Sequence, residues 1–549
     1  MIRSFIERAK LGESVYICDV RDAFSSVDTA VGCIIETATG EINSWTIPLP
    51  KTADKQEEDF VRDYFYANIY NIISTYGGKH MTFYVDPGDD FIEHLCNTLD
   101  VVFQVGLSRA DRFGYGKCLN VTDRVNAAFG HKPFHFVIKH GKSDVDIHNE
   151  GPQEDAISAF RNAVSSAYNA VLIGLDIGGS DIKAVGSVDG HIVSLKEFDW
   201  DPSSMTRIEQ IIDGITNVVE EICSELGESV KPDGIGVGFP DVVIDNKIVG
   251  GETLKTRSIR LASPDYETEF ARLFELDDVL RGYCKPGGIV NMTNDGNLAA
   301  FTAAVELACS SRADETKAGV LAHTLGTEFG TGWIDENGDI PQIPLEIYNG
   351  IIDMGNFTAR EFEPFDLRSM LNFNTGIPGT LQKYASQTGA YRLAVEYFKE
   401  DAEEIYNELC NMGFIEEKNG GIYVVLSPSD MRKPLLSYIM KLADEGQPQA
   451  EQVFKVIGKY LAATWRETEF LLRPKTKRRI LYGRFVKSQR CLKLMQDGAC
   501  EMIDIALEAG DDDLANTPLM QELKNNPDYT VAQFGQAIGA VHFAAKNRC

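Results

Sequence analysis

The sequence lacks the features that mark several large classes of protein. No stretch approaches the ~18 consecutive apolar residues of a membrane span. Its 11 cysteines form no CxxC motif, and the closest pair is Cys491 and Cys500. The segment MIRSFIERAKLGES at the start has no apolar core of a secretory signal. These absences predict reduced thiols and a soluble, cytoplasmic protein with no membrane partner.

Basic residues are also scarce. Lys and Arg number 53 against 82 Asp and Glu, which gives a net charge of −29 and a pI of about 4.7. A surface of this sign repels nucleic-acid phosphates and anionic lipids, so no nucleic-acid partner is expected. A length of 549 residues with 44% apolar content predicts more than one folded domain.

The most informative segment is 171–185, VLIGLDIGGSDIKAV. An apolar strand ends at Asp176, a tight turn follows at Gly178, Gly179 and Ser180, and a second strand carries Lys183. Such a turn exposes backbone N–H groups that can bind a phosphate. An aspartate at the end of the strand can hold Mg²⁺ directly or through water. Taken alone, the segment equally describes an ordinary hairpin.

Two further motifs follow in the chain. Asn294-Asp295-Gly296-Asn297 lies between a strand-like run and an Ala-rich helix, and LGTEFGTG at 325–332 is a second glycine loop. A carboxylate at a strand-to-helix junction can accept a proton from a hydroxyl. Asp295 could instead cap the helix. The flanking motifs favour the catalytic interpretation.

In order and separation, these three motifs resemble those of the ROK-family sugar kinases, within the actin/hexokinase/Hsp70 superfamily, over roughly residues 170–549. The resemblance implies an α/β fold with two actin-like (RNase H-like) lobes around a nucleotide cleft. It implies an ATP- and Mg²⁺-dependent carbohydrate kinase acting on a hexose or N-acetylhexosamine hydroxyl. Asp295 would be the catalytic base.

The resemblance also assigns binding roles. The predicted nucleotide-binding residues are Asp176, Gly178, Gly179, Ser180, Lys183, Gly326, Thr327, Gly330 and Gly483. Asp176 would also hold the metal. The predicted sugar-binding residues are Asn294, Glu346 and Asp241.

The chain departs from the family pattern at several points. Glu328 replaces a glycine of the second loop, Asn349 replaces the histidine that follows Glu346, and the cysteine-rich zinc segment is missing. Glu328 either points away or helps to hold Mg²⁺, or else it weakens ATP binding by repulsion. The alternative function is therefore a catalytically degraded ROK-like protein that senses a sugar or nucleotide. Lys255 and Arg257 are basic residues that have two interpretations. They either bind an acidic or phosphorylated substrate, or they are ordinary charged residues of the surface.

We divide the chain into an N-terminal α/β accessory domain at 1–165, a first lobe at 166–315 and a second lobe at 316–549 with the adenosine site. In the first region, a helix is predicted at 55–76 and strands at 15–20, 29–36, 42–47, 81–86 and 101–107. The region is either a decayed actin-like half, with Asp19 in the place of Asp176, or an unrelated domain. It would replace a dimer partner, cover an apolar face or regulate closure. Monomer and homodimer both remain open.

Overall fold

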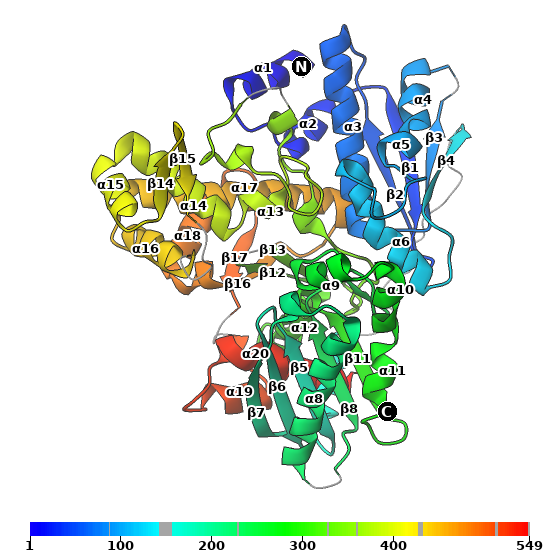
Figure 1. The fold of residues 1–549 in the computed structure, drawn as a ribbon, viewed down its shortest axis with the longest axis vertical. Helices are drawn as coiled ribbons and strands as arrows, with labels where there is room; N and C mark the ends of the chain where they lie inside the picture. The colour runs from blue at the N-terminus through cyan, green and yellow to red at the C-terminus, as the bar shows by residue number, and fades with distance from the viewer. Residues whose placement is uncertain are drawn as a thin grey trace.

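The computed structural model describes residues 1–86, 88–141, 156–227, 230–326, 329–357, 361–425, 432–510 and 514–546. It is an α/β protein with three main sheets, which confirms the predicted fold class. In Figure 1 the N-terminal domain lies at the upper right, the first lobe at the bottom and the second lobe between them and to the left. Thr327 and Glu328 lie outside the described residues, as do residues 142–155 of the polar stretch 141–155, which the sequence predicts to be a linker or a loop leading into a short helix.

The sheet of the first lobe has the strand order β11-β8-β5-β6-β7. Its strands are β5 (Val171–Ile177), β6 (Asp181–Val188), β7 (His191–Asp199), β8 (Gly234–Phe239) and β11 (Ile289–Asn294). β5, β6 and β7 form an antiparallel meander, and β8 and β11 run parallel to β5. This is the strand arrangement of an actin-like lobe.

Helices cover both faces of this sheet. The isoleucine and valine stripe of α8 (Ile208–Leu226) packs with Ile173, Leu175 and Ile177 of β5. The opposite face, with Leu172, packs against α20 (Val531–Ala545). Assigning all of 316–549 to the second lobe is therefore wrong for this last helix, whose small residues fit against first-lobe strands. The other predicted domain limits stay a prediction.

The second lobe contains a smaller sheet of order β13-β12-β16-β17. Its strands are β12 (Val320–Leu325), β13 (Phe329–Ile334), β16 (Arg478–Gly483) and β17 (Ala506–Ala509). Beside it, α14 (Gln387–Asp401) and α18 (Gln489–Cys500) both pack on the long helix α17 (Pro448–Leu472). His323 is a buried residue of the sheet, where it accepts a hydrogen bond from Nε1 of Trp465 (3.0 Å).

The N-terminal domain places α3 (Lys55–Tyr76) on a sheet of order β2-β1-β3-β4. The strands are β1 (Ala30–Glu36), β2 (Ile42–Pro48), β3 (His80–Val85) and β4 (His135–His140). The strands predicted at 15–20 and 101–107 are wrong. Residues Ile17–Phe24 form helix α2, and Leu99–Val102 form the short helix α5. Ile17, Val20 and Phe24 are buried at helical spacing, which a short apolar run does not distinguish from a strand.

This loss of the first strand bears on the decayed-copy hypothesis. Asp19 lies on α2 and pairs with Arg466 (2.5 Å), so it is not a counterpart of Asp176. The first strand of this domain, β1, also does not match β5. It runs antiparallel to its neighbour β3, whereas β5 runs parallel to its neighbour β8. The N-terminal sheet β2-β1-β3-β4 nevertheless resembles the first-lobe sheet with one strand removed. If β5 were taken out, β7-β6-β8-β11 would have the same order and the same strand directions. The strand that would carry a phosphate loop is thus absent from the described part of this domain.

The remaining elements connect these layers. They are α1 (Ile2–Leu11), α4 (Asp90–Asn97), α6 (Cys118–Ala128), α7 (Ala156–Ser165), β9 (Val243–Ile244), β10 (Lys247–Ile248), α9 (Arg257–Ala262), α10 (Tyr266–Phe270), α11 (Leu276–Arg281), α12 (Asp295–Ala308), α13 (Leu381–Tyr384), α15 (Glu403–Asn411), β14 (Ile415–Lys418), β15 (Gly421–Val424), α16 (Arg432–Asp444) and α19 (Pro518–Lys524).

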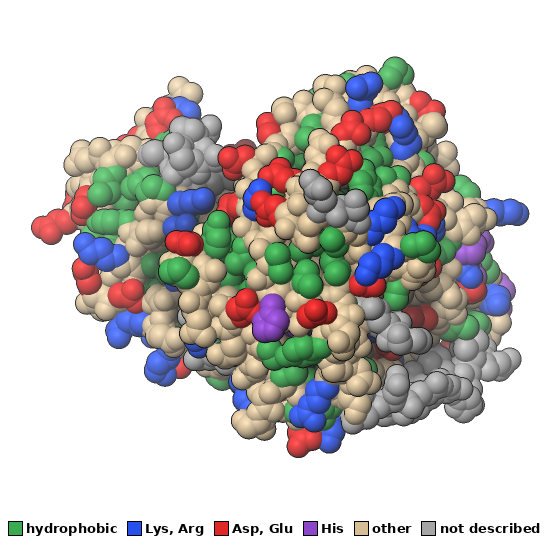
Figure 2. All heavy atoms as spheres, turned by 90° about the horizontal axis from the view of Figure 1, so that it is seen from below, with side chains coloured by type: hydrophobic (Ala, Val, Ile, Leu, Met, Phe, Trp, Pro, Cys, Tyr) green, Lys and Arg blue, Asp and Glu red, His purple; other side chains and the backbone are tan. Residues whose placement is uncertain are grey.

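One continuous apolar core joins the N-terminal domain to the second lobe. Arg21 of α2 crosses this boundary to pair with buried Glu467 of α17 (2.7 Å). None of the described helices is long and apolar enough to cross a membrane. On the face in Figure 2, acidic and basic side chains are interspersed.

Candidate functional site

The first glycine loop is a tight turn between β5 and β6. The N–H of Gly178 donates to the carbonyl of Asp181 (2.8 Å), and Trp200 Nε1 donates to the carbonyl of Gly178 (3.1 Å). Gly179 and Ser180 are exposed, and their N–H groups have no acceptor among the described residues. The loop therefore offers free backbone donors, as phosphate binding requires.

Charged groups stand around this loop. Asp176 at the end of β5 lies opposite Lys183 of β6, whose ammonium pairs with Asp181. Burial raises the pKa of Asp176 to about 7; the charge of Lys183 opposes this rise, and the charges of Asp295 and Asp181 add to it. The predicted metal ligand and the predicted base are thus close enough to interact. Lys183 is held by Asp181 rather than free for a phosphate.

Asp295 is the first residue of α12, directly after β11. Asn294 is the N-cap residue of α12, and its Oδ1 accepts from the N–H of Gly296 (2.9 Å); Oδ1 of Asp295 accepts from the same N–H (2.8 Å). The side chain of Asp295 is exposed to solvent, although protein atoms are dense around its carboxyl group. This burial raises the pKa of its carboxyl, and the positive charge of Lys255 lowers it. Asp295 therefore accepts a hydrogen bond at the start of the helix, and its side chain is exposed to solvent.

The second glycine loop follows β12 in the other lobe. Gly326 accepts from the N–H of Gln387 (3.1 Å), and the N–H of Gly330 donates to Oγ1 of Thr324 (3.1 Å). Gly483 ends the parallel strand β16, where it is the register partner of Leu325. Gly326 and Gly483 therefore lie at the same sheet edge, where the carboxyl ends of parallel strands place ligand sites.

A close backbone approach ties the start of α12 to β13. A Cβ on Gly332 would overlap the carbonyl of Gly296, and Asn297 Oδ1 accepts from the N–H of Trp333 (3.1 Å). Asp295 is thus fixed between the sheet of the first lobe and the hairpin that carries the second loop.

The predicted sugar-binding residues lie together, but most of their polar atoms are engaged. Asn294 Nδ2 donates to the carbonyl of Asp241 (2.9 Å). Burial raises the pKa of Asp241, whose carboxylate accepts from Val242 N–H (2.9 Å) and Gly251 N–H (2.8 Å). Burial raises the pKa of Glu346 to about 8, and the charges of Asp241 and Glu252 contribute.

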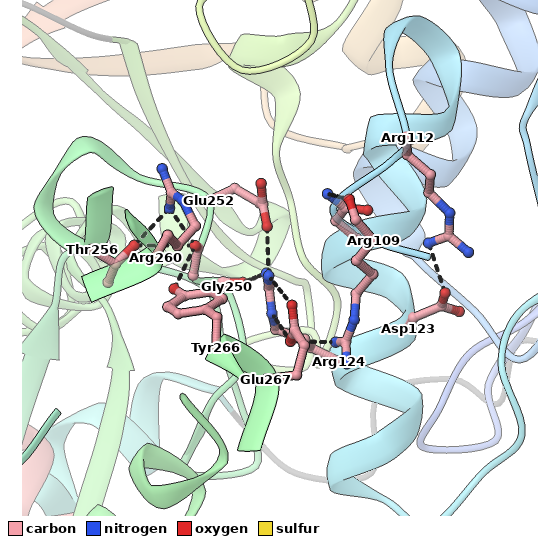
Figure 3. Close-up of polar contacts among 12 residues, drawn as sticks. Arg109, Arg112, Asp123, Arg124, Gly250, Glu252, Thr256, Arg260, Tyr266 and Glu267 are labelled. Carbon is pink, nitrogen blue, oxygen red and sulfur yellow. Dashed lines mark hydrogen bonds and ion pairs between the residues drawn. The ribbon is translucent and has the colours of Figure 1, made fainter. Parts of the chain in front are cut away.

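Several charged residues near this site were not identified from the sequence. Arg124 of α6 reaches from the N-terminal domain to Glu252 and Glu267 of the first lobe (Figure 3). Its partners are more than a hundred residues away in the chain. The one sequence feature that could have indicated Arg124 is that it is the lone arginine in the mostly apolar segment CLNVTDRVNAA. Lys255, whose role the sequence left open, donates from Nζ to the carbonyl of Pro240 (3.2 Å) and lies close enough to Asp295 for its charge to act on that carboxyl.

The residues fit a nucleotide with a divalent metal. Unpaired N–H groups in the first loop suit phosphate oxygens, and Asp176, Asp181 and Asp295 concentrate negative charge that a cation would relieve. No group of three or more His, Cys, Asp or Glu side chains among the described residues forms a self-sufficient metal site. Mg²⁺ bound through one carboxylate and phosphates needs no such group.

A cavity of about 1020 Å³ lies elsewhere, where the three parts of the chain meet. It is lined by Trp45 of the N-terminal domain, Asn246 and Asn291 of the first lobe, and Trp333 and Arg473 of the second. None of the predicted site residues lines it, so its size says nothing about the glycine loops.

Together these features define a two-lobed α/β protein with an actin-like first lobe and a glycine loop in each lobe. No family model matches the chain, and no curated protein matches it. Among solved structures, the chain is similar to a ROK family glucokinase from Streptomyces griseus in complex with glucose and AMPPNP. Identity is 19%, coverage is 68% of this chain and 99% of that one, and the TM-score is 0.41.

Two other solved structures are similar at the same level. A ROK hexokinase from Thermus thermophilus has 16% identity, coverage of 68% and 98%, and a TM-score of 0.40. A ROK family transcriptional regulator, a homolog of the E. coli MLC protein, has 14% identity, coverage of 69% and 81%, and a TM-score of 0.41. They belong to the family that the motifs resemble. Similarity this low supports no conclusion about activity, and the fold assignment rests on strand order.

Proposed function

We propose that this protein is an ATP-dependent carbohydrate kinase of ROK type, which transfers the γ-phosphate to a hydroxyl of a hexose or N-acetylhexosamine. The observation that carries the proposal is Asp295, which is accessible to solvent, follows the N-cap residue Asn294 and is fixed between the two lobes. Its raised pKa suits a group that must accept a hydroxyl proton near neutral pH.

In this proposal the turn Gly178–Ser180, through the N–H groups of Gly179 and Ser180, binds the nucleotide together with Gly326, Thr327, Gly330 and Gly483, and Asp176 holds Mg²⁺. Bound ATP supplies the phosphoryl group, and Mg²⁺ neutralises its charge. Asp295 accepts the proton of the sugar hydroxyl, and Asp241, Asn294 and Glu346 form the acceptor side. We further propose a cytoplasmic location, in keeping with described cysteines that are all free thiols.

The test is release of ADP across a panel of hexoses and N-acetylhexosamines, with Mg²⁺ present. We expect sugar-dependent turnover that falls by about 10²–10⁴-fold in Asp295→Asn, since the variant keeps the shape and loses the base. Asp189→Asn, in an exposed turn of the same lobe, is the matched control and should retain full activity. Turnover that survives in Asp295→Asn would remove this residue as the base.

A degraded protein that senses a sugar or nucleotide is the second candidate. Asp181 favours it, because its carboxylate lies beside Ser180 Oγ (3.1 Å) at the rim of the first loop, where it repels phosphate. Lys183 offsets that charge. Sugar binding, seen as a rise in Tm with no turnover for any sugar, would favour the sensor.

A further inference from the structure

The N-terminal domain reaches the acceptor side of the site through one buried arginine. The guanidinium of Arg124 donates to Glu252 (2.6 Å), to both carboxylate oxygens of Glu267 (2.7 and 2.9 Å) and to the carbonyl of Gly250. Its side chain is only 2% exposed and lies near the rings of Tyr266 and Phe270. Figure 3 shows it crossing from α6 to the first lobe.

The contact with Gly250 is the informative one, because a single peptide unit links Arg124 to Asp241. The carbonyl of this unit, on Gly250, accepts from Arg124, and its N–H, on Gly251, donates to Asp241 Oδ2 (2.8 Å). A charged donor at the carbonyl fixes the peptide plane and strengthens the N–H as a donor. Arg124 therefore orients the group that holds Asp241.

The same arginine also balances charge. Asp241 and Glu252 each lie close enough to Glu346 for their charges to act on it. Burial alone would raise the pKa of Glu252, but the charges of Arg124, Arg260 and Lys117 bring it below its usual value. Without Arg124, the carboxylate of Glu252 would lose its main compensating charge beside Glu346.

We infer that Arg124 is a positioning residue for the acceptor site, through the loop of residues 249–257, which we name the acceptor loop. This loop carries Glu252 and Lys255 beside Asp241. The N-terminal domain shares its core with the second lobe. Arg124 thus links that body to the acceptor side of the first lobe and gives residues 1–140 a role in substrate binding. The kinetic part of this inference rests on the proposed kinase function.

Arg124→Gln tests the inference, and Arg109→Gln is the matched control. Arg109 pairs with the same Glu267 (2.7 Å), and no contact joins it to Gly250 or Glu252 among the described residues. We expect Arg124→Gln to raise the KM for the sugar by about tenfold or more, with the KM for ATP changed less than about twofold. Arg109→Gln should leave both constants near those of the wild type.

Backbone hydrogen exchange supplies a readout that needs no activity. In Arg124→Gln, amides of the acceptor loop should exchange faster, while those of 171–185 stay as in the wild type. Equal effects of the two variants, or unchanged exchange in the acceptor loop, would overturn the inference. If the wild type turns over no sugar, the kinase proposal fails. The inference about Arg124 is then tested by hydrogen exchange in the acceptor loop alone.

Arg124→Lys covers the case in which Arg124→Gln does not fold. Lysine keeps the charge, but its ammonium cannot engage the carbonyl and both carboxylates as the planar fork does. Exchange in the acceptor loop should then exceed that of the wild type and of Arg109→Lys. Protection equal to that of the wild type would again contradict the role of Arg124.

Discussion

At the scale of single residues, the charges around Asp295 decide when it can accept a proton. Burial raises the pKa of its carboxyl, Lys255 lowers it, and Asp176 interacts with it across the first loop. Asp295 must be ionised to act as a base, so activity should be lost as the pH falls through its raised pKa. The acid side of the pH–rate profile therefore reports on this residue.

Lys255→Met should move that acid limb to higher pH. The ammonium of Lys255 favours the ionised form of Asp295, so its removal raises the pKa further and the base is protonated at higher pH. The measurement is kcat/KM for the sugar against pH. Arg257→Gln, on an exposed side chain two residues along the chain, is the control and should leave the profile in place. An unchanged limb in Lys255→Met would mean that another group sets it.

At the scale of helices and strands, α20 packs directly on the backbone of the central strands. A Cβ on Gly236 of β8 would overlap the carbonyl of Ala540, and a Cβ on Gly174 of β5 would overlap that of Ala537. Alternate glycines in GIGVGF thus leave room for a helix whose facing residues are also small. The layer behind the first loop depends on this fit.

Gly236→Ala should lower the free energy of unfolding by about 3 kcal/mol, because backbone atoms of α20 cannot move away as a flexible side chain would. Gly32→Ala is the matched control: Gly32 is also a glycine in a strand, and a Cβ there meets nothing within 4 Å. Urea unfolding of both variants makes the comparison. A cost for Gly236→Ala no larger than for Gly32→Ala would show that α20 can shift.

The helices and strands also show which parts of the fold could be predicted from the sequence. The spacing of apolar residues and the residues at each boundary correctly predicted the helix at 55–76 and the strand at 42–47, because long or well-bounded patterns leave few alternatives. They failed at 15–20, since a buried six-residue run suits either structure. The three motifs indicated Asp176 and Asp295, which the structure brings close together. Arg124 escaped notice because its contacts join distant parts of the chain, which one sequence does not reveal.

At the scale of the whole molecule, the N-terminal domain and the second lobe behave as one body. They share an apolar core, and Arg21 and Glu467, only 10% and 3% exposed, pair across the boundary. Asn71 Nδ2 also donates to Glu467 (2.9 Å). The domain is therefore integral to the fold, and its contact with the first lobe through Arg124 is held by a rigid support.

Glu467→Gln should destabilise this shared body by about 3 kcal/mol, since Arg21 would stay buried without an opposite charge. Glu469→Gln, which removes the half-buried partner of the exposed Lys477, should cost less than about 1 kcal/mol. Hydrogen exchange should then accelerate in α3 and α17 alike, because one core spans both helices. Acceleration confined to α3 would mean that the N-terminal domain unfolds independently, and Arg124 would then lose its rigid support.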